Sequence, residues 1–290
     1  MPDRRVLLTL SNGKQCRSLI PILLSDPSYT LVRAFARNSA SAKGQCPNHP
    51  FISKLQVFEG DLRNVSDIEK AMEGIDTVFH VGPPMSVHES SIGISVIQAA
   101  RKAGVKHFVL SSVLQPFRSK LLNHDVKLAV EEYLVESRLN WTILQPTHFM
   151  QSSDLLGSVE RGCLFVPWDP ANVISFVDAR DMADVVKKVM DDGESHYNAT
   201  YELVGQTASY RDYGAAISRI AGKEIKVERA DPRAVSRVMG GEEEDLQDRF
   251  ERLFLYYDRW GLIGNSNVLG WLLGKPPRTL DVYVKDRLAS

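Results

Sequence analysis

The chain has 290 residues, with 35 Lys plus Arg against 36 Asp plus Glu and a formal net charge of −1. This balance argues against a nucleic-acid-binding protein, which normally carries a basic excess on one face. Three scattered cysteines are too few for a disulfide framework or a tetrahedral zinc site, so we expect a reducing, cytoplasmic location and no metal. Apolar runs stay well below the ~20 residues of a membrane span, and we expect neither a signal peptide nor a membrane protein.

Short apolar strands alternate with amphipathic helices in the first half of the chain. The predicted strands are Val6–Leu10, Thr30–Ala36, Leu55–Phe58, Thr77–Val81, Lys106–Ser112 and Trp141–Gln145. The predicted helices are Lys14–Leu24, Ile68–Met72 with Ser66 or Asp67 as its N-cap, Ser91–Ala103 ended by Gly104, and Asp125–Ser137. Neighbouring parallel strands need crossover connections, which are usually helical, so the alternation predicts a doubly wound parallel α/β sheet with helices on both faces. The polar segment 39–49 is predicted as a loop.

The alternation weakens beyond residue 150. Strands are still predicted at Ile174–Val177 and Thr200–Leu203, and a helix at Asp181–Met190, before the chain becomes more polar and helical. We therefore expect residues 1–150 to form the core. Residues 151–290 would in part complete that core and otherwise form a smaller, mainly helical substrate lobe. The acidic run Glu242–Asp245 is predicted to be a solvated helix N-terminus rather than a binding site.

The segment Thr9–Cys16 lies between the first predicted strand and helix, where dinucleotide-binding proteins carry a glycine-rich phosphate loop. Gly13 stands at the middle glycine position, but Leu10 and Cys16 occupy the outer two. Leucine disfavours a positive φ, and its side chain would crowd the approach of a phosphate. Cysteine is small and easier to accommodate. The loop therefore predicts a degraded nucleotide site, with Leu10 as its main defect.

A nucleotide at this site would meet residues that follow the first three predicted strands. The candidate cofactor-binding residues are Ser11, Asn12, Gly13, Lys14, Gln15, Arg37, Asn38 and Asp61. Arg37 at the end of the second strand is placed to meet a 2′-phosphate, which favours NADP over NAD, although a solvated strand-end charge is the alternative. Asp61 lies in a turn suited to contact adenine.

Several segments resemble the NmrA-like group of atypical short-chain dehydrogenases. They are Gly13-Lys14-Gln15, Ala36-Arg37-Asn38, Glu59-Gly60-Asp61-Leu62, Val105–Ser112, Asn123-His124-Asp125-Val126-Lys127, Trp141–Pro146, Phe176–Met182 and Asn265–Gly274. The resemblance implies a Rossmann domain with a C-terminal substrate lobe and often an NADP site. It also places Lys127 at the family's lysine position, which makes Lys127 a further candidate cofactor-binding residue. The usual Tyr-x-x-x-Lys pair is missing, because Asn123 stands four residues before Lys127 and an amide cannot supply a proton as a phenol can.

Ligands of open α/β sheets bind outside the carboxyl ends of the strands, so the candidate catalytic groups are sought there. They are Lys127, His80, His124, His148 and Tyr256. Each has a structural alternative: His80 would be a buried histidine, His124 and Lys127 would form a surface pair, and Tyr256 would pack its helix.

Three functions remain open from the sequence. The absent tyrosine and the lost glycines favour an acid/base-assisted rearrangement, cyclisation or isomerisation of a small molecule, and the resemblance implies that it would belong to a fungal-type secondary-metabolite pathway. The alternatives are an NADPH-dependent reductase of an alkene, imine or carbonyl, and an NADP-sensing regulator without turnover. We expect a small-molecule substrate and a monomer or homodimer in each case.

Overall fold

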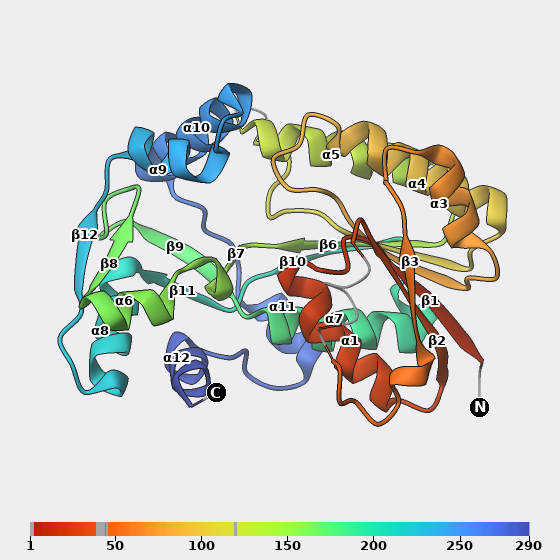
Figure 1. Ribbon diagram of the computed structural model, residues 1–290, viewed down its shortest axis with the longest axis horizontal. Coiled ribbons are helices and arrows are strands. Elements are labelled where there is room, and N and C mark those ends of the chain that lie inside the picture. The colour runs from red at the N-terminus through yellow and green to blue at the C-terminus, as the bar shows by residue number, and fades with distance from the viewer. Residues whose placement is uncertain (1–2, 39–43, 45, 119–120, 290) are drawn as a thin grey trace.

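The computed structural model describes residues 3–38, 44, 46–118 and 121–289, and a parallel sheet forms its centre (Figure 1). Its seven strands lie in the order β10-β6-β5-β4-β1-β2-β3. They are β1 (Arg4–Leu8), β2 (Tyr29–Ala36), β3 (Leu55–Glu59), β4 (Thr77–Val81), β5 (His107–Ser111), β6 (Trp141–Pro146) and β10 (Ala199–Leu203). All neighbouring pairs are parallel. The order 3-2-1-4-5-6 is that of doubly wound nucleotide-binding folds, which confirms the predicted fold class.

Helices cover both faces of this sheet (Figure 1). One face carries α3 (Val65–Met72), α4 (Glu89–Ala103) and α5 (Leu122–Glu136), and the other carries α1 (Lys14–Ser25), α7 (Ala179–Asp192) and α11 (Asn267–Leu273). Helices α4 and α5 approach closely at Gly93, where an added Cβ would meet Val130 Cγ2 at 2.6 Å. Gly104 ends α4 with a φ of 71°, as its position in the sequence predicts.

Some predicted boundaries need correction. Strand β1 ends at Leu8 rather than Leu10, because the turn that leads into α1 begins at Thr9 and includes Leu10. Helix α3 begins at Val65, and its N-cap is Asn64, whose side chain accepts a hydrogen bond from the backbone N–H of Ser66 at 3.0 Å. The predicted loop 39–49 lies partly outside the described residues.

The remaining elements form the C-terminal lobe, at the left of Figure 1. It contains β7 (His148–Phe149), β8 (Cys163–Val166), β9 (Val173–Val177), β11 (Gln206–Ser209), β12 (Lys226–Arg229), α6 (Leu155–Arg161), α8 (Tyr210–Ala221), α9 (Pro232–Gly240), α10 (Glu244–Trp260) and α12 (Leu280–Leu288). The lobe is mainly helical, as the sequence predicts, and it also contains two small sheets, β11-β9-β7 and β12-β8. Strand β10 and helix α7 return to the central sheet, and a division at residue 150 stays a prediction. Within the described part of the chain, no helix is long and apolar enough to cross a membrane.

Candidate functional site

A cleft of about 830 Å³ lies at the carboxyl edge of the central sheet. The loops that follow β1, β2, β3 and β4 line it, together with the first residues of α10. Its lining residues are Leu10, Ser11, Asn12, Phe35, Ala36, Arg37, Asn38, Asp61, Leu62, Arg63, Pro83, Pro84, Met85, Ser86, Val87, His88, Ile92, Glu243, Asp245 and Leu246. The volume falls within the range of small-molecule and cofactor sites. The structure thus brings together most of the predicted cofactor-binding residues.

Leu10 adopts the backbone conformation that a glycine would supply at this position. Its φ is +48°, and its carbonyl oxygen accepts a hydrogen bond from the backbone N–H of Gly13 at 2.8 Å. Its side chain packs at the margin of the core cluster that contains α1. Sequence reasoning expects leucine to disfavour this conformation, and the structure shows that the loop adopts it nonetheless. Left-handed backbone at a non-glycine residue costs about 1–3 kcal/mol and is characteristic of functional sites.

Met85, in the loop after β4, also lines the cleft and repeats this feature. Its φ is +65° and only 7% of its surface is exposed. Gln115, after β5, also has a positive φ, of 55°. Three loops at the carboxyl edge therefore hold strained non-glycine residues.

The N-terminus of α1 is suited to an anion. Its N-cap, Gly13, provides no side-chain hydrogen bond, and its first turn contains no acidic residue but includes Lys14. A cation near the positive end of a helix is unfavourable unless an anion lies beside it. Cys16 takes the third glycine position without difficulty, because it is fully buried with Sγ 3.5 Å from the carbonyl oxygen of Thr9.

The other predicted loop residues connect α1 to neighbouring elements. The buried hydroxyl of Ser11 donates to the carbonyl oxygen of Phe35 in β2 at 2.9 Å. Gln15 Oε1 accepts a hydrogen bond from Ser111 Oγ at the end of β5, at 2.8 Å. These contacts fix the loop relative to the strands on both sides of β1.

Arg37, which follows β2, and Arg63, which follows β3, differ in their ion pairs. Arg63 forms an ion pair with Asp61, with Nη2 2.6 Å from Oδ2, and these hydrogen bonds lower the pKa of Asp61. Asn38 and Arg37 are exposed. Among the described residues no salt bridge engages Arg37, so its guanidinium is available to a phosphate.

Lys127 lies beside the end of β5, on α5, and pairs with a residue that sequence reasoning missed. Its Nζ donates to Oε1 of Glu89, the first residue of α4, and only 2% of the Glu89 side chain is exposed. An acidic residue in the first turn of a helix is normally a capping charge, so no local pattern marks Glu89 as a site residue.

The predicted catalytic histidines are buried, and burial lowers their pKa values. His80 Nδ1 lies 2.9 Å from Thr9 Oγ1, and its pKa falls to about 3. His124 Nδ1 lies 3.1 Å from the carbonyl oxygen of Gln115, and its pKa falls to about 4. His148 Nε2 lies 2.9 Å from the hydroxyl of Tyr210, and its pKa also falls to about 4. Neutral histidines held in this way are poor proton donors near pH 7, and His124 does not form a surface pair with Lys127.

Tyr256 does not line the cleft. The guanidinium of Arg118, in the loop after β5, lies 5.9 Å from the centre of its ring. Its neighbour Tyr257 is buried against Trp168 in the core of the C-terminal lobe. The structure therefore gives Tyr256 a packing contact, and its catalytic role stays a prediction.

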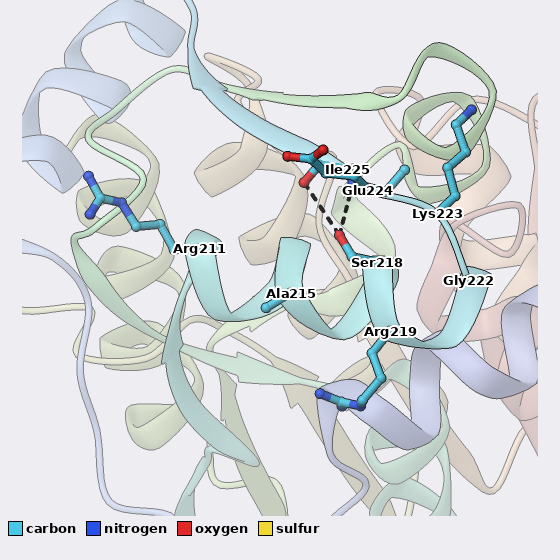
Figure 2. Close-up of a pocket in the computed structure, with 8 residues that line it drawn as sticks. All are labelled: Arg211, Ala215, Ser218, Arg219, Gly222, Lys223, Glu224 and Ile225. Carbon is cyan, nitrogen blue, oxygen red and sulfur yellow. Dashed lines mark hydrogen bonds between the residues drawn. The ribbon is translucent and has the colours of Figure 1, made fainter.

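Depressions elsewhere on the described part of the chain include two whose size is comparable to that of this cleft. One, of about 760 Å³, shares Asn12 with it and extends between α1 and the C-terminal lobe, where Lys14, Gln151 and Arg180 line it. Figure 2 shows the other, of about 680 Å³, on the surface of α8, where Arg219 and further basic side chains extend away from one another. None of the predicted site residues lines the depression on α8, so it adds nothing to the candidate site.

Comparison with known proteins agrees with this geometry. The model of the NmrA-like family matches residues 2–270. The chain belongs to the NmrA-like family. It is 29% identical over 242 residues to the NAD(P)H azoreductase of Xenophilus azovorans, covering 81% of this chain and 84% of the relative.

Two solved structures share the fold. The NADPH-dependent quinone oxidoreductase of Escherichia coli, complexed with NADPH, superposes with a TM-score of 0.80 at 22% identity, covering 98% of this chain and 100% of that one. The negative transcriptional regulator NmrA, in complex with NAD, gives a TM-score of 0.80 at 18% identity, covering 99% of this chain and 95% of that one. The azoreductase and the quinone oxidoreductase are thus named as enzymes that use nicotinamide nucleotides. This favours the reductase alternative over the rearrangement or isomerisation that the sequence suggests, and nothing in the comparisons supports a role in secondary metabolism.

Proposed function

We propose that the protein is an NADPH-dependent reductase of a small electron-accepting molecule, such as a quinone or an azo compound. The observation that carries the proposal is the conformation of Leu10, which gives the phosphate loop the shape of a glycine-containing loop beside a cleft of about 830 Å³. The names of the azoreductase and quinone oxidoreductase relatives support the substrate class.

The residues of the cleft fit a dinucleotide. The uncapped N-terminus of α1 at Gly13 is suited to the pyrophosphate, and an added Cβ there would meet the carbonyl oxygen of Leu10 at 3.1 Å. Arg37 is suited to a 2′-phosphate, since its guanidinium can donate two parallel hydrogen bonds. A bound NADPH would supply the hydride.

The chain's own groups would then handle the proton. Lys127 is the proposed donor, because it is the cationic side chain at the carboxyl end of β5 and its side chain is 15% exposed. The depression that shares Asn12 with the cleft offers room for the electron acceptor on the side of the C-terminal lobe.

Nucleotide titration followed by a turnover assay tests the proposal. Fluorescence titration should show micromolar binding of NADPH, and the bound nucleotide should be consumed when a quinone or an azo dye is added. Gly13→Ala should weaken binding at least tenfold, because the new methyl group crowds the loop. Gly270→Ala is the matched control, since its nearest neighbour is Pro277 Cδ at 3.8 Å.

Each other outcome identifies an alternative. If the folded protein binds neither NADPH nor NADH, the proposal is wrong, and the non-redox rearrangement becomes the favoured function. Tight binding without consumption by any acceptor would instead favour a nucleotide-sensing regulator, the role that the name of the NmrA structure gives that protein.

A further inference from the structure

The carboxylate of Glu89 is buried but only half engaged. Its Oε1 accepts the hydrogen bond from Lys127 Nζ, whereas its Oε2 has no hydrogen-bond partner among the described residues. A buried polar atom left without a partner costs about 1–3 kcal/mol, and more when it is charged. A donor is therefore expected beside Oε2.

A small cavity adjoins this ion pair. It is lined by His80, Gly82, Glu89, Leu110, Ser111, Ser112, Lys127 and Val130. The space open to the centre of a water molecule is about 10 Å³. One water needs roughly 10–15 Å³ by this measure together with at least two polar partners, and the lining offers a carboxylate, an ammonium and two hydroxyls.

Gly82 makes room for this arrangement. A Cβ at this position would lie 2.6 Å from Glu89 Oε1 and 2.9 Å from its Cγ. Any larger residue directly after β4 would thus displace the carboxylate from Lys127. The loop after β4 and the start of α4 therefore fit together around the ion pair.

We propose that Glu89 is a positioning residue that holds Lys127 for proton delivery, and that one water in this cavity joins Glu89 Oε2 to the proton path. The inference rests on the proposed reductase function. Reduction of a quinone by NADPH adds one hydride, which carries both electrons, and leaves an oxyanion that takes one proton. The Lys127 ammonium donates that proton and becomes a neutral amine. The water then passes a proton from solvent back to the amine, so the overall reaction consumes one NADPH and one proton.

Lys127 and Glu89 differ in how far their side chains are buried, and we expect them to have different roles. The Lys127 side chain is 15% exposed and that of Glu89 is 2% exposed, so of the two only Lys127 offers surface to a ligand. Glu89 thus acts through Lys127, and its loss should slow the proton step without weakening nucleotide binding.

The Glu89→Gln variant tests this inference, because it keeps the shape of the side chain and removes its charge. We expect kcat for quinone reduction to fall about 10–100-fold, within the usual range for general acid catalysis, while the KM for NADPH stays within twofold. The solvent deuterium isotope effect on kcat should rise, because proton delivery becomes rate-limiting. Glu69→Gln is the matched control, since Glu69 pairs with Lys102 on the exposed surface of α3 and α4 and should leave both quantities unchanged.

If kcat and the solvent isotope effect of Glu89→Gln equal those of the wild-type protein, the inference is wrong. If that variant fails to fold, a high-resolution crystal structure of the wild-type protein decides: an ordered water within hydrogen-bond distance of Glu89 Oε2 supports it, and the lack of one overturns it. The proposed function fails separately, when the wild-type protein itself neither binds nor consumes NADPH.

Discussion

The clearest physical prediction concerns Leu10. We expect Leu10→Gly to be more stable than Leu10→Ala, although glycine normally lowers stability. Both variants lose the same partly buried side chain, so their difference isolates the backbone. At a φ of +48°, replacing a residue that has a Cβ by glycine relieves about 1–2 kcal/mol of strain. Glycine also gains conformational freedom in the unfolded chain, which offsets about 0.5–1 kcal/mol of this, and the middle of the two ranges leaves a net advantage of about 0.75 kcal/mol.

Leu55 provides the matched control for this comparison. It is also partly buried and packs against the same core cluster, but its φ is −83°. Alanine should therefore be more stable than glycine at this position by about 0.5–1 kcal/mol. Urea unfolding of the four variants measures both differences. The reasoning is refuted if alanine is equal to or better than glycine at Leu10, because the loop would then carry no strain.

The same variant has a functional consequence. If Leu10 already holds the loop in a nucleotide-binding conformation, Leu10→Gly should change the affinity for NADPH by less than threefold. A gain above tenfold would mean that the leucine side chain obstructs the phosphates, as the sequence alone suggests.

Three further predictions follow from the burial and charge of single residues. Arg37→Ala should weaken the binding of NADPH about tenfold and leave the binding of NADH unchanged, since a hydrogen bond to a charged group contributes at least about 1.5 kcal/mol. An equal loss of affinity for both nucleotides in a fluorescence titration would contradict this. Stability should fall as the pH drops from about 6.5 towards 4, because the lowered pKa values of His80, His124 and His148 make the unfolded chain bind protons first. Each histidine contributes up to about 1.4 kcal/mol per pH unit, and pH-independent urea midpoints between pH 7 and 5 would refute it. Cys16 should resist thiol reagents in the native protein, because it is fully buried and its pKa is raised to about 12; early modification found by mass spectrometry would contradict its burial.

The sequence by itself determined the architecture. Short apolar runs and helical apolar spacing locate strands and helices through residue 150, and β4 runs from Thr77 to Val81 as predicted. The end of α4 at Gly104 and the turns after β1, β2 and β3 can be located from the residue types at those positions. These features depend on neighbours a few positions away, so a single sequence carries them.

The tertiary structure decided the chemistry of the site. Glu89 and Lys127 are 38 residues apart, and they meet only because α4 and α5 pack side by side. Whether His80 donates a proton depends on burial by strands distant in sequence, which sets its pKa. The conformation of Leu10 likewise depends on packing and hydrogen bonds that outweigh the intrinsic preference of leucine. Local propensities amount to about 1–2 kcal/mol per residue, and a packed core can exceed them.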